Sequence, residues 1–293
     1  MALIRILIAV CAAAMAAAPQ TQPEALRTLE YARPQSGALL LDLYLPPSGG
    51  PFPLIVWIHG GAFRAGNKGG IWYKPILNQT RRGYAVASID YRLSGTAQFP
   101  ALVQDAKAAI RWLRASAAQF HLNTDRIVVA GESAGGYQAA MLGTTGGVTE
   151  LEGALGSPKD SSRVQGVIDF FGPTDFLAMD DGASSCKTPM VHRTADSPES
   201  LLLGCNLDAC PEKVKAANPI TYVSRDDPPF LILHGTADCL VPHSQSQRLY
   251  DALRAAGDKA DLHLLPGVGH ADQRFMTSET EKWVSDFVDS VLR

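Results

Sequence analysis

The stretch R-I-V-V-A-G-E-S-A-G, residues 126–135, decides the fold of this chain. Its first half is a short continuous apolar run, which predicts a buried strand, and a helical pattern follows over 134–143. Gly131 and Gly135 allow a sharp turn between the two, with the Ser133 hydroxyl exposed at the bend and the helix N-terminus pointing at it. A G-x-S-x-G sequence also arises by chance, and a serine that caps a helix is the structural alternative. The strand-turn-helix context favours a nucleophile.

Short apolar runs alternate with longer helical patterns along most of the chain. The runs predict strands at 38–45, 53–59, 84–90, 126–130, 164–171, 229–234 and 261–265, and the patterns predict helices at 101–118, 134–143, 244–256 and 278–292. Most runs are continuously apolar rather than alternating, which is typical of strands buried on both faces. The sequence therefore predicts an α/β fold, a mostly parallel central sheet with helices on both faces.

One stretch, about 174–228, breaks this alternation. It is loop-rich and contains only short helical pieces, around 198–203 and 211–217. Loops of this length inside a compact domain are usually functional. We expect a small lid over a site, inserted into a single catalytic domain at 19–293.

A second motif, H-G-G-A-F at 59–63, directly follows the predicted strand at 53–59. A backbone with few bulky side chains can approach a ligand closely, and its N–H groups can stabilise a developing oxyanion. A glycine-rich turn is the structural alternative. The presence of the 131–135 motif in the same chain favours the oxyanion-binding role.

The two motifs together resemble the α/β-hydrolase superfamily, specifically carboxylesterases of the hormone-sensitive-lipase type and the related bacterial feruloyl/acetylxylan esterases. The resemblance implies an oxyanion hole built from the amides of Gly61 and Ala62, with Gly60 as a further candidate, and from Ala134, the residue after the nucleophile. Ala62 stands where the family usually has a fourth-place glycine, but a backbone donor survives that change. The resemblance also implies that no metal or organic cofactor is needed.

The likeness continues in D-Y-R-L-S at 90–94 and in the helical segment at 99–114, so that it covers nearly the whole chain after the N-terminal segment.

A catalytic triad on this fold needs an acid and a histidine after the serine. Asp238 follows the predicted strand at 229–234, in a loop that resembles the family's acid loop, and Asp175 is the rival acid. His270 lies between the last predicted strand and the last helix, where the fold delivers its base. We therefore predict Ser133, Asp238 and His270 as the triad.

The N-terminal residues predict export. Residues 1–18 hold one basic residue, Arg5, a short apolar run and an alanine-rich end, which is typical of a cleaved signal peptide and too short for a membrane span. Cleavage is expected after Ala16 or Ala18. A lipid anchor on Cys11 is disfavoured because Val10 precedes it.

Four cysteines remain after the signal peptide: Cys186, Cys205, Cys210 and Cys239. An even number in an exported chain favours disulfides, with three possible connectivities. The short turn N-L-D-A favours pairing Cys205 with Cys210, which leaves Cys186 with Cys239. A metal site is the alternative, but there is no C-x-x-C and no histidine near the first pair.

The charge balance argues against nucleic acid as a partner. The 293 residues carry 26 basic and 29 acidic side chains, and no Lys/Arg run could neutralise a row of phosphates.

Taken together, the motifs, the triad candidates and the N-terminal segment predict a secreted serine carboxylic-ester hydrolase with a small-molecule or polysaccharide-linked substrate of the acetyl or feruloyl type. A prolyl-oligopeptidase-like peptidase is one alternative, although such enzymes normally carry a propeller domain. An inactive binding module is the other, and the filled triad positions disfavour it.

Overall fold

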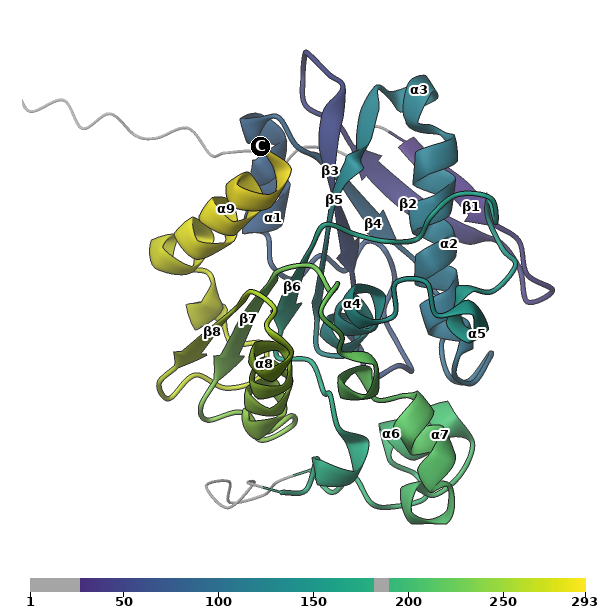
Figure 1. Ribbon diagram of the computed structural model, residues 1–293, viewed down its shortest axis with the longest axis vertical. Helices are drawn as coiled ribbons and strands as arrows, with labels where there is room; N and C mark the ends of the chain where they lie inside the picture. Colours follow the sequence, from purple (N-terminus) through teal and green to yellow (C-terminus); the bar gives the residue numbers. More distant parts are fainter. Residues whose placement is uncertain (1–26, 182–189) are drawn as a thin grey trace, which may run out of the picture.

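The computed structural model describes residues 27–181 and 190–293, and its centre is an eight-stranded sheet (Figure 1). The strand order is β1-β2-β4-β3-β5-β6-β7-β8. The strands are β1 (Arg27–Ala32), β2 (Leu39–Tyr44), β3 (Phe52–Ile58), β4 (Ala85–Ile89), β5 (Leu122–Glu132), β6 (Gly166–Phe170), β7 (Phe230–Gly235) and β8 (Ala260–Leu265). The predicted signal peptide at 1–18 lies outside the described residues.

The sheet is antiparallel at one edge and parallel elsewhere. β1 pairs with β2 and β2 with β4 in antiparallel register, whereas β4, β3, β5, β6, β7 and β8 are parallel neighbours. The carboxyl ends of these parallel strands therefore meet at one edge, where α/β proteins place their sites. The residues of β4, β6 and β7 are all buried, as their continuous apolar runs predict.

Helices cover both faces of the sheet, which confirms the predicted fold class (Figure 1). One face carries α1 (Pro75–Asn78) and α9 (Ser278–Leu292), whose apolar side chains pack with Trp57 and Phe170 in one core cluster. The other face carries α2 (Ala101–Ala115), α4 (Ala134–Thr144) and α8 (Ser244–Ala256), which share the second cluster with residues such as Val56. The remaining short elements are α3 (Ala117–Phe120), α5 (Thr149–Glu152), α6 (Pro198–Leu203), α7 (Pro211–Ala216), and the 3-10 turns η1 (Gln79–Arg82), η2 (Phe176–Ala178), η4 (Leu207–Ala209), η5 (Pro219–Tyr222) and η6 (Gln273–Phe275).

Several boundaries differ from the sequence prediction. β1 was not predicted, because its first residues are polar and mostly exposed at the sheet edge. The predicted helix at 101–118 is two helices, with α2 ending before Ser116 and α3 starting after it. The strand predicted at 126–130 extends over the whole of β5, since residues at its start also pair with β3.

The chain from Met190 to Tyr222 lies beyond the carboxyl ends of the strands, with α6 and α7 below the sheet in Figure 1. Both helices fall where the sequence predicts helical pieces. A disulfide joins Cys205 to Cys210 between them, as predicted. The other predicted pair, Cys186 with Cys239, stays a prediction because Cys186 lies outside the described residues.

Within residues 27–181 and 190–293, no helix is both long enough and apolar enough to cross a bilayer.

Candidate active site

Ser133 lies in the tight turn between β5 and α4. Its backbone is left-handed, with φ 51° and ψ −118°, a conformation that costs energy for any residue except glycine. Both flanking glycines are required by close backbone contacts. A Cβ on Gly135 would lie 2.1 Å from the carbonyl oxygen of Ile58, and one on Gly131 would lie 2.3 Å from that of Gly135. The turn therefore fixes where the serine hydroxyl points.

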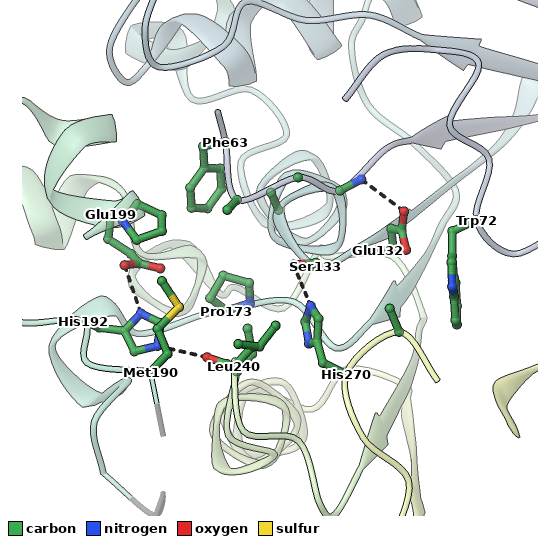
Figure 2. Close-up of a pocket in the computed structure, with 17 residues that line it drawn as sticks. Phe63, Trp72, Glu132, Ser133, Pro173, Met190, His192, Glu199, Leu240 and His270 are labelled. Carbon is green, nitrogen blue, oxygen red and sulfur yellow. Dashed lines mark hydrogen bonds and ion pairs between the residues drawn. The ribbon is translucent and has the colours of Figure 1, made fainter. Parts of the chain in front are cut away.

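The three residues predicted as a triad lie in one hydrogen-bonded chain (Figure 2). The Ser133 hydroxyl is 3.0 Å from Nε2 of His270, and Nδ1 of His270 is 2.6 Å from Oδ2 of Asp238. The rival acid, Asp175, has its carboxylate 3.9 Å from the guanidinium of Arg248 instead. The geometry is that of a nucleophile, a base and an orienting acid.

Asp238 is a buried carboxylate held by several donors. Its Oδ1 accepts the backbone N–H groups of Leu240 and Val241, each at 2.9 Å, and its Oδ2 also lies 3.3 Å from Nε2 of His234. Burial alone would raise the pKa of Asp238, but the hydrogen bonds from His234 and His270 outweigh burial and hold its pKa well below the ordinary range. The carboxylate is therefore ionised at neutral pH.

The loop after β3 lines the same pocket. Gly61, Ala62 and Phe63 all have positive φ, and a Cβ on Gly61 would lie 2.1 Å from the carbonyl oxygen of Ala65. Among the described residues, no acceptor pairs with the N–H groups of Gly61, Ala62 or Ala134, all of which line the pocket.

Gly60, the further candidate donor, differs from Gly61, Ala62 and Ala134. The Gly60 N–H donates to Oε1 of Glu132 at 3.4 Å, so this amide already has a protein acceptor. Glu132 is buried next to the nucleophile, and burial raises its pKa to about 7. This contact gives Glu132 a structural role beside Ser133. His59 supports the same loop, because its ring stacks on Tyr91 with centroids 4.3 Å apart.

These groups open into one cavity of about 370 Å³. Figure 2 shows Trp72 on one side of the Ser133–His270 pair and a larger set of side chains on the other. Sequence reasoning missed the residues of that larger set as pocket residues: Phe63, Pro173, Met190, His192, Pro198, Glu199, Leu240 and Val241. They come from four separate segments: Phe63 ends the H-G-G-A-F motif and residues 190–199 lie in the predicted lid, but no motif or periodicity shows which of these side chains face the pocket.

A buried ion pair lies in this wall. Nδ1 of His192 is 3.0 Å from Oε2 of Glu199, and its Nε2 is 2.9 Å from the carbonyl oxygen of Leu240. Both ring nitrogens face acceptors, an arrangement that favours the doubly protonated, charged ring. Burial alone would lower the pKa of His192, but Glu199 and the Leu240 carbonyl outweigh it and raise the pKa. The pair ties the segment before α6 to the loop that carries Asp238.

Among residues 27–181 and 190–293, there is no group of three or more His, Cys, Asp or Glu side chains that could hold a metal ion.

Comparison with known proteins agrees with this architecture. A mostly parallel sheet with a strained serine at a strand-helix turn and a histidine after the last strand defines the α/β-hydrolase class. Within that class, the BD-FAE family model matches residues 41–253, and the chain belongs to this family.

Three relatives illustrate the likeness. A carbohydrate esterase from gut microbiota, in truncated form, has 34% sequence identity and a TM-score of 0.80, over 93% of this chain and 98% of that one. The propionate-bound esterase Est2 of Thermogutta terrifontis has 26% identity and a TM-score of 0.74, over 93% and 96% of the two chains. Esterase LipC of Mycobacterium tuberculosis is 33% identical over 75% of this chain and 53% of its own length. The chain thus spans about half the length of the curated relatives it matches.

Proposed function

We propose that this protein is a serine carboxylic-ester hydrolase with Ser133 as nucleophile, His270 as general base and Asp238 as the acid that orients the histidine. The observation that carries the proposal is the unbroken hydrogen-bonded chain from the Ser133 hydroxyl through His270 to a buried, ionised Asp238. Esterase relatives and esterase structures support the same reaction class.

The reaction follows from the geometry. Ser133 attacks the ester carbonyl carbon while His270 takes the hydroxyl proton at Nε2, and Asp238 stabilises the resulting imidazolium. The N–H groups of Gly61, Ala62 and Ala134 stabilise the tetrahedral oxyanion. His270 then protonates the leaving alcohol, and it activates the water that hydrolyses the acyl-enzyme. We leave Gly60 out of the oxyanion hole because its N–H donates to Glu132.

The substrate that we propose is an ester with a short acyl or an aryl group, of the acetyl or feruloyl type. The cavity of about 370 Å³ lies near the lower end of the range for small-molecule sites. A carbohydrate esterase and a propionate-bound esterase among the structural relatives support small acyl groups and carbohydrate-linked esters.

We also propose that the enzyme acts outside the cytoplasm and that the segment around α6 and α7 serves as its lid. The Cys205–Cys210 disulfide supports export, because such bonds persist mainly in oxidising compartments. Met190, His192, Pro198 and Glu199 support the lid, because all four line the pocket.

Turnover of p-nitrophenyl acetate by purified protein, compared with Ser133→Ala, tests the proposed function. We expect the variant to lose ~10⁴- to 10⁶-fold in kcat without unfolding. Equal turnover by both proteins would show that Ser133 is not the nucleophile, and no turnover by the wild type would favour a binding module. A parallel prolyl-peptide substrate separates the esterase from the peptidase alternative.

A further inference from the structure

The carboxylate of Glu199 is a buried acceptor whose second oxygen has no protein partner. Glu199 lies in the first turn of α6, is 3% exposed and lines the same cavity as Ser133. Its Oε2 accepts the Nδ1–H of His192. In the part of the chain that the structure describes, no donor reaches Oε1, and Figure 2 shows this oxygen turned toward the middle of the pocket.

The carboxylate is held firmly in this position. His192 is 2% exposed and is itself fixed from its other side, since its Nε2–H donates to the Leu240 carbonyl. The N-terminus of α6 is capped as well, because the Ser197 hydroxyl oxygen accepts the N–H of Ser200. Glu199 therefore presents a fixed acceptor rather than a mobile surface charge, as specific recognition requires.

The charges of the pair indicate what kind of group Oε1 can bind. A His192 ring that donates from both nitrogens is a cation and balances the charge of Glu199. A substrate cation would therefore gain little net attraction, whereas a neutral hydroxyl can still donate a short, charge-assisted hydrogen bond.

The neighbouring pocket wall makes this hydrogen bond matter for specificity. Phe63, Pro173, Met190 and Leu240 surround the acceptor with mostly apolar surface. A substrate that covers Glu199 without supplying a donor leaves a buried acceptor unpaired, and such mismatches are costly.

We propose that Glu199 determines substrate specificity by accepting a hydrogen bond from a hydroxyl group of the ester. The inference rests on the proposed function of this pocket. The hydroxyl can belong to the alcohol half, as in a sugar, or to the acyl half, as in a hydroxyaryl acid.

Two matched substrate pairs distinguish these sources. The first compares 2-acetoxycyclohexanol with cyclohexyl acetate, and the second compares methyl 4-hydroxycinnamate with methyl cinnamate. For the wild type, we expect kcat/KM to favour the hydroxylated ester by ~10- to 100-fold in one of the pairs. Turnover of p-nitrophenyl acetate, which has no hydroxyl donor, serves as the reference for an intact catalytic centre.

Two variants of Glu199 test whether this preference depends on its carboxylate. Glu199→Gln keeps the shape and an acceptor for His192 but loses the charge, and should reduce the preference at least about threefold. Glu199→Met offers the hydroxyl no comparable acceptor and should abolish the preference. The readout is the ratio of kcat/KM within each substrate pair, because a general loss of activity lowers both esters of a pair alike and leaves the ratio unchanged. Glu212→Gln, at an exposed position of α7, is the matched control and should keep the preference.

Two results would overturn the inference: no hydroxyl preference in either pair, or a preference unchanged in Glu199→Gln. If Glu199→Met does not fold, Glu199→Gln alone decides. Failure of the wild type to hydrolyse p-nitrophenyl acetate would instead overturn the proposed function.

Discussion

Replacing Asp238 by asparagine should force His270 into the wrong tautomer. In the wild type, Oδ1 accepts two backbone N–H groups, from Leu240 and Val241, and Oδ2 accepts the Nδ1–H of His270. The backbone donors cannot reverse, so the single oxygen of asparagine must face them. Its NH₂ group then points at Nδ1 of His270, which must act as an acceptor.

The wrong tautomer of His270 prevents activation of the nucleophile, Ser133. With Nδ1 as acceptor, the proton of neutral His270 lies on Nε2, which is 3.0 Å from the Ser133 hydroxyl and can no longer accept its proton. We expect kcat to fall by ~10³- to 10⁴-fold, equivalent to ~4–5.5 kcal/mol of transition-state stabilisation. The protein should remain folded, because the backbone donors keep their acceptor.

The assay is kcat for p-nitrophenyl acetate, with the melting curve recorded on the same sample. Asp175→Asn is the matched control, since Asp175 also follows a strand but lies near Arg248 instead of His270. If Asp238→Asn retained a tenth of the wild-type kcat, or if Asp175→Asn were the more damaging variant, the assignment of the acid would be wrong.

Three further perturbations test the structure around the site. Glu132 has a pKa of about 7 in the folded protein against 4.5 ordinarily, so its contribution to stability is present below pH 4.5 and is lost as pH rises through 7. The side chain in Glu132→Gln stays neutral, so urea titrations should find this variant about 2–3 kcal/mol more stable than the wild type at pH 8.5 and equally stable at pH 4. If the variant and the wild type were equally stable at both pH values, the raised pKa would be contradicted. Gly135→Ala places a Cβ 2.1 Å from the Ile58 carbonyl oxygen, and it should lower the free energy of unfolding by at least about 2–3 kcal/mol and remove most of the esterase activity. A variant with the same melting temperature and turnover as the wild type would refute that close contact. Replacing Cys205 and Cys210 by serine opens a loop of sequence separation 5 and should lower the free energy of unfolding by ~2 kcal/mol, and an unchanged value would mean that the bond adds no constraint.

The parts of the site that depend on local sequence could be predicted from it. Gly131, Ser133 and Gly135 form a turn whose geometry is set within five residues, and His270 lies in a loop whose place in the fold is fixed by the strand before it. The structure brings His270 and the predicted Asp238 together. Such features can be predicted because the sheet order brings the carboxyl ends of β5, β7 and β8 to one edge.

Other features depend on contacts between distant segments and leave no trace in the sequence. Gly60 is a further candidate oxyanion donor in the sequence, and only the approach of Glu132 from β5 shows that its N–H is engaged. No motif marks His192, whose ring lies between Glu199 and the carbonyl of the distant Leu240. Loop-rich sequence has no periodicity from which such pairs could be predicted.

The central claim, that Ser133 is the nucleophile activated by His270, is tested most directly by covalent labelling. The protein is treated with a fluorophosphonate, which phosphonylates activated serines, and the site of the adduct is mapped by mass spectrometry of its peptides. We predict one adduct, on Ser133, that is absent from Ser133→Ala and forms far more slowly in His270→Ala. An unlabelled wild-type protein, or an adduct on another residue that persists in Ser133→Ala, would contradict the account.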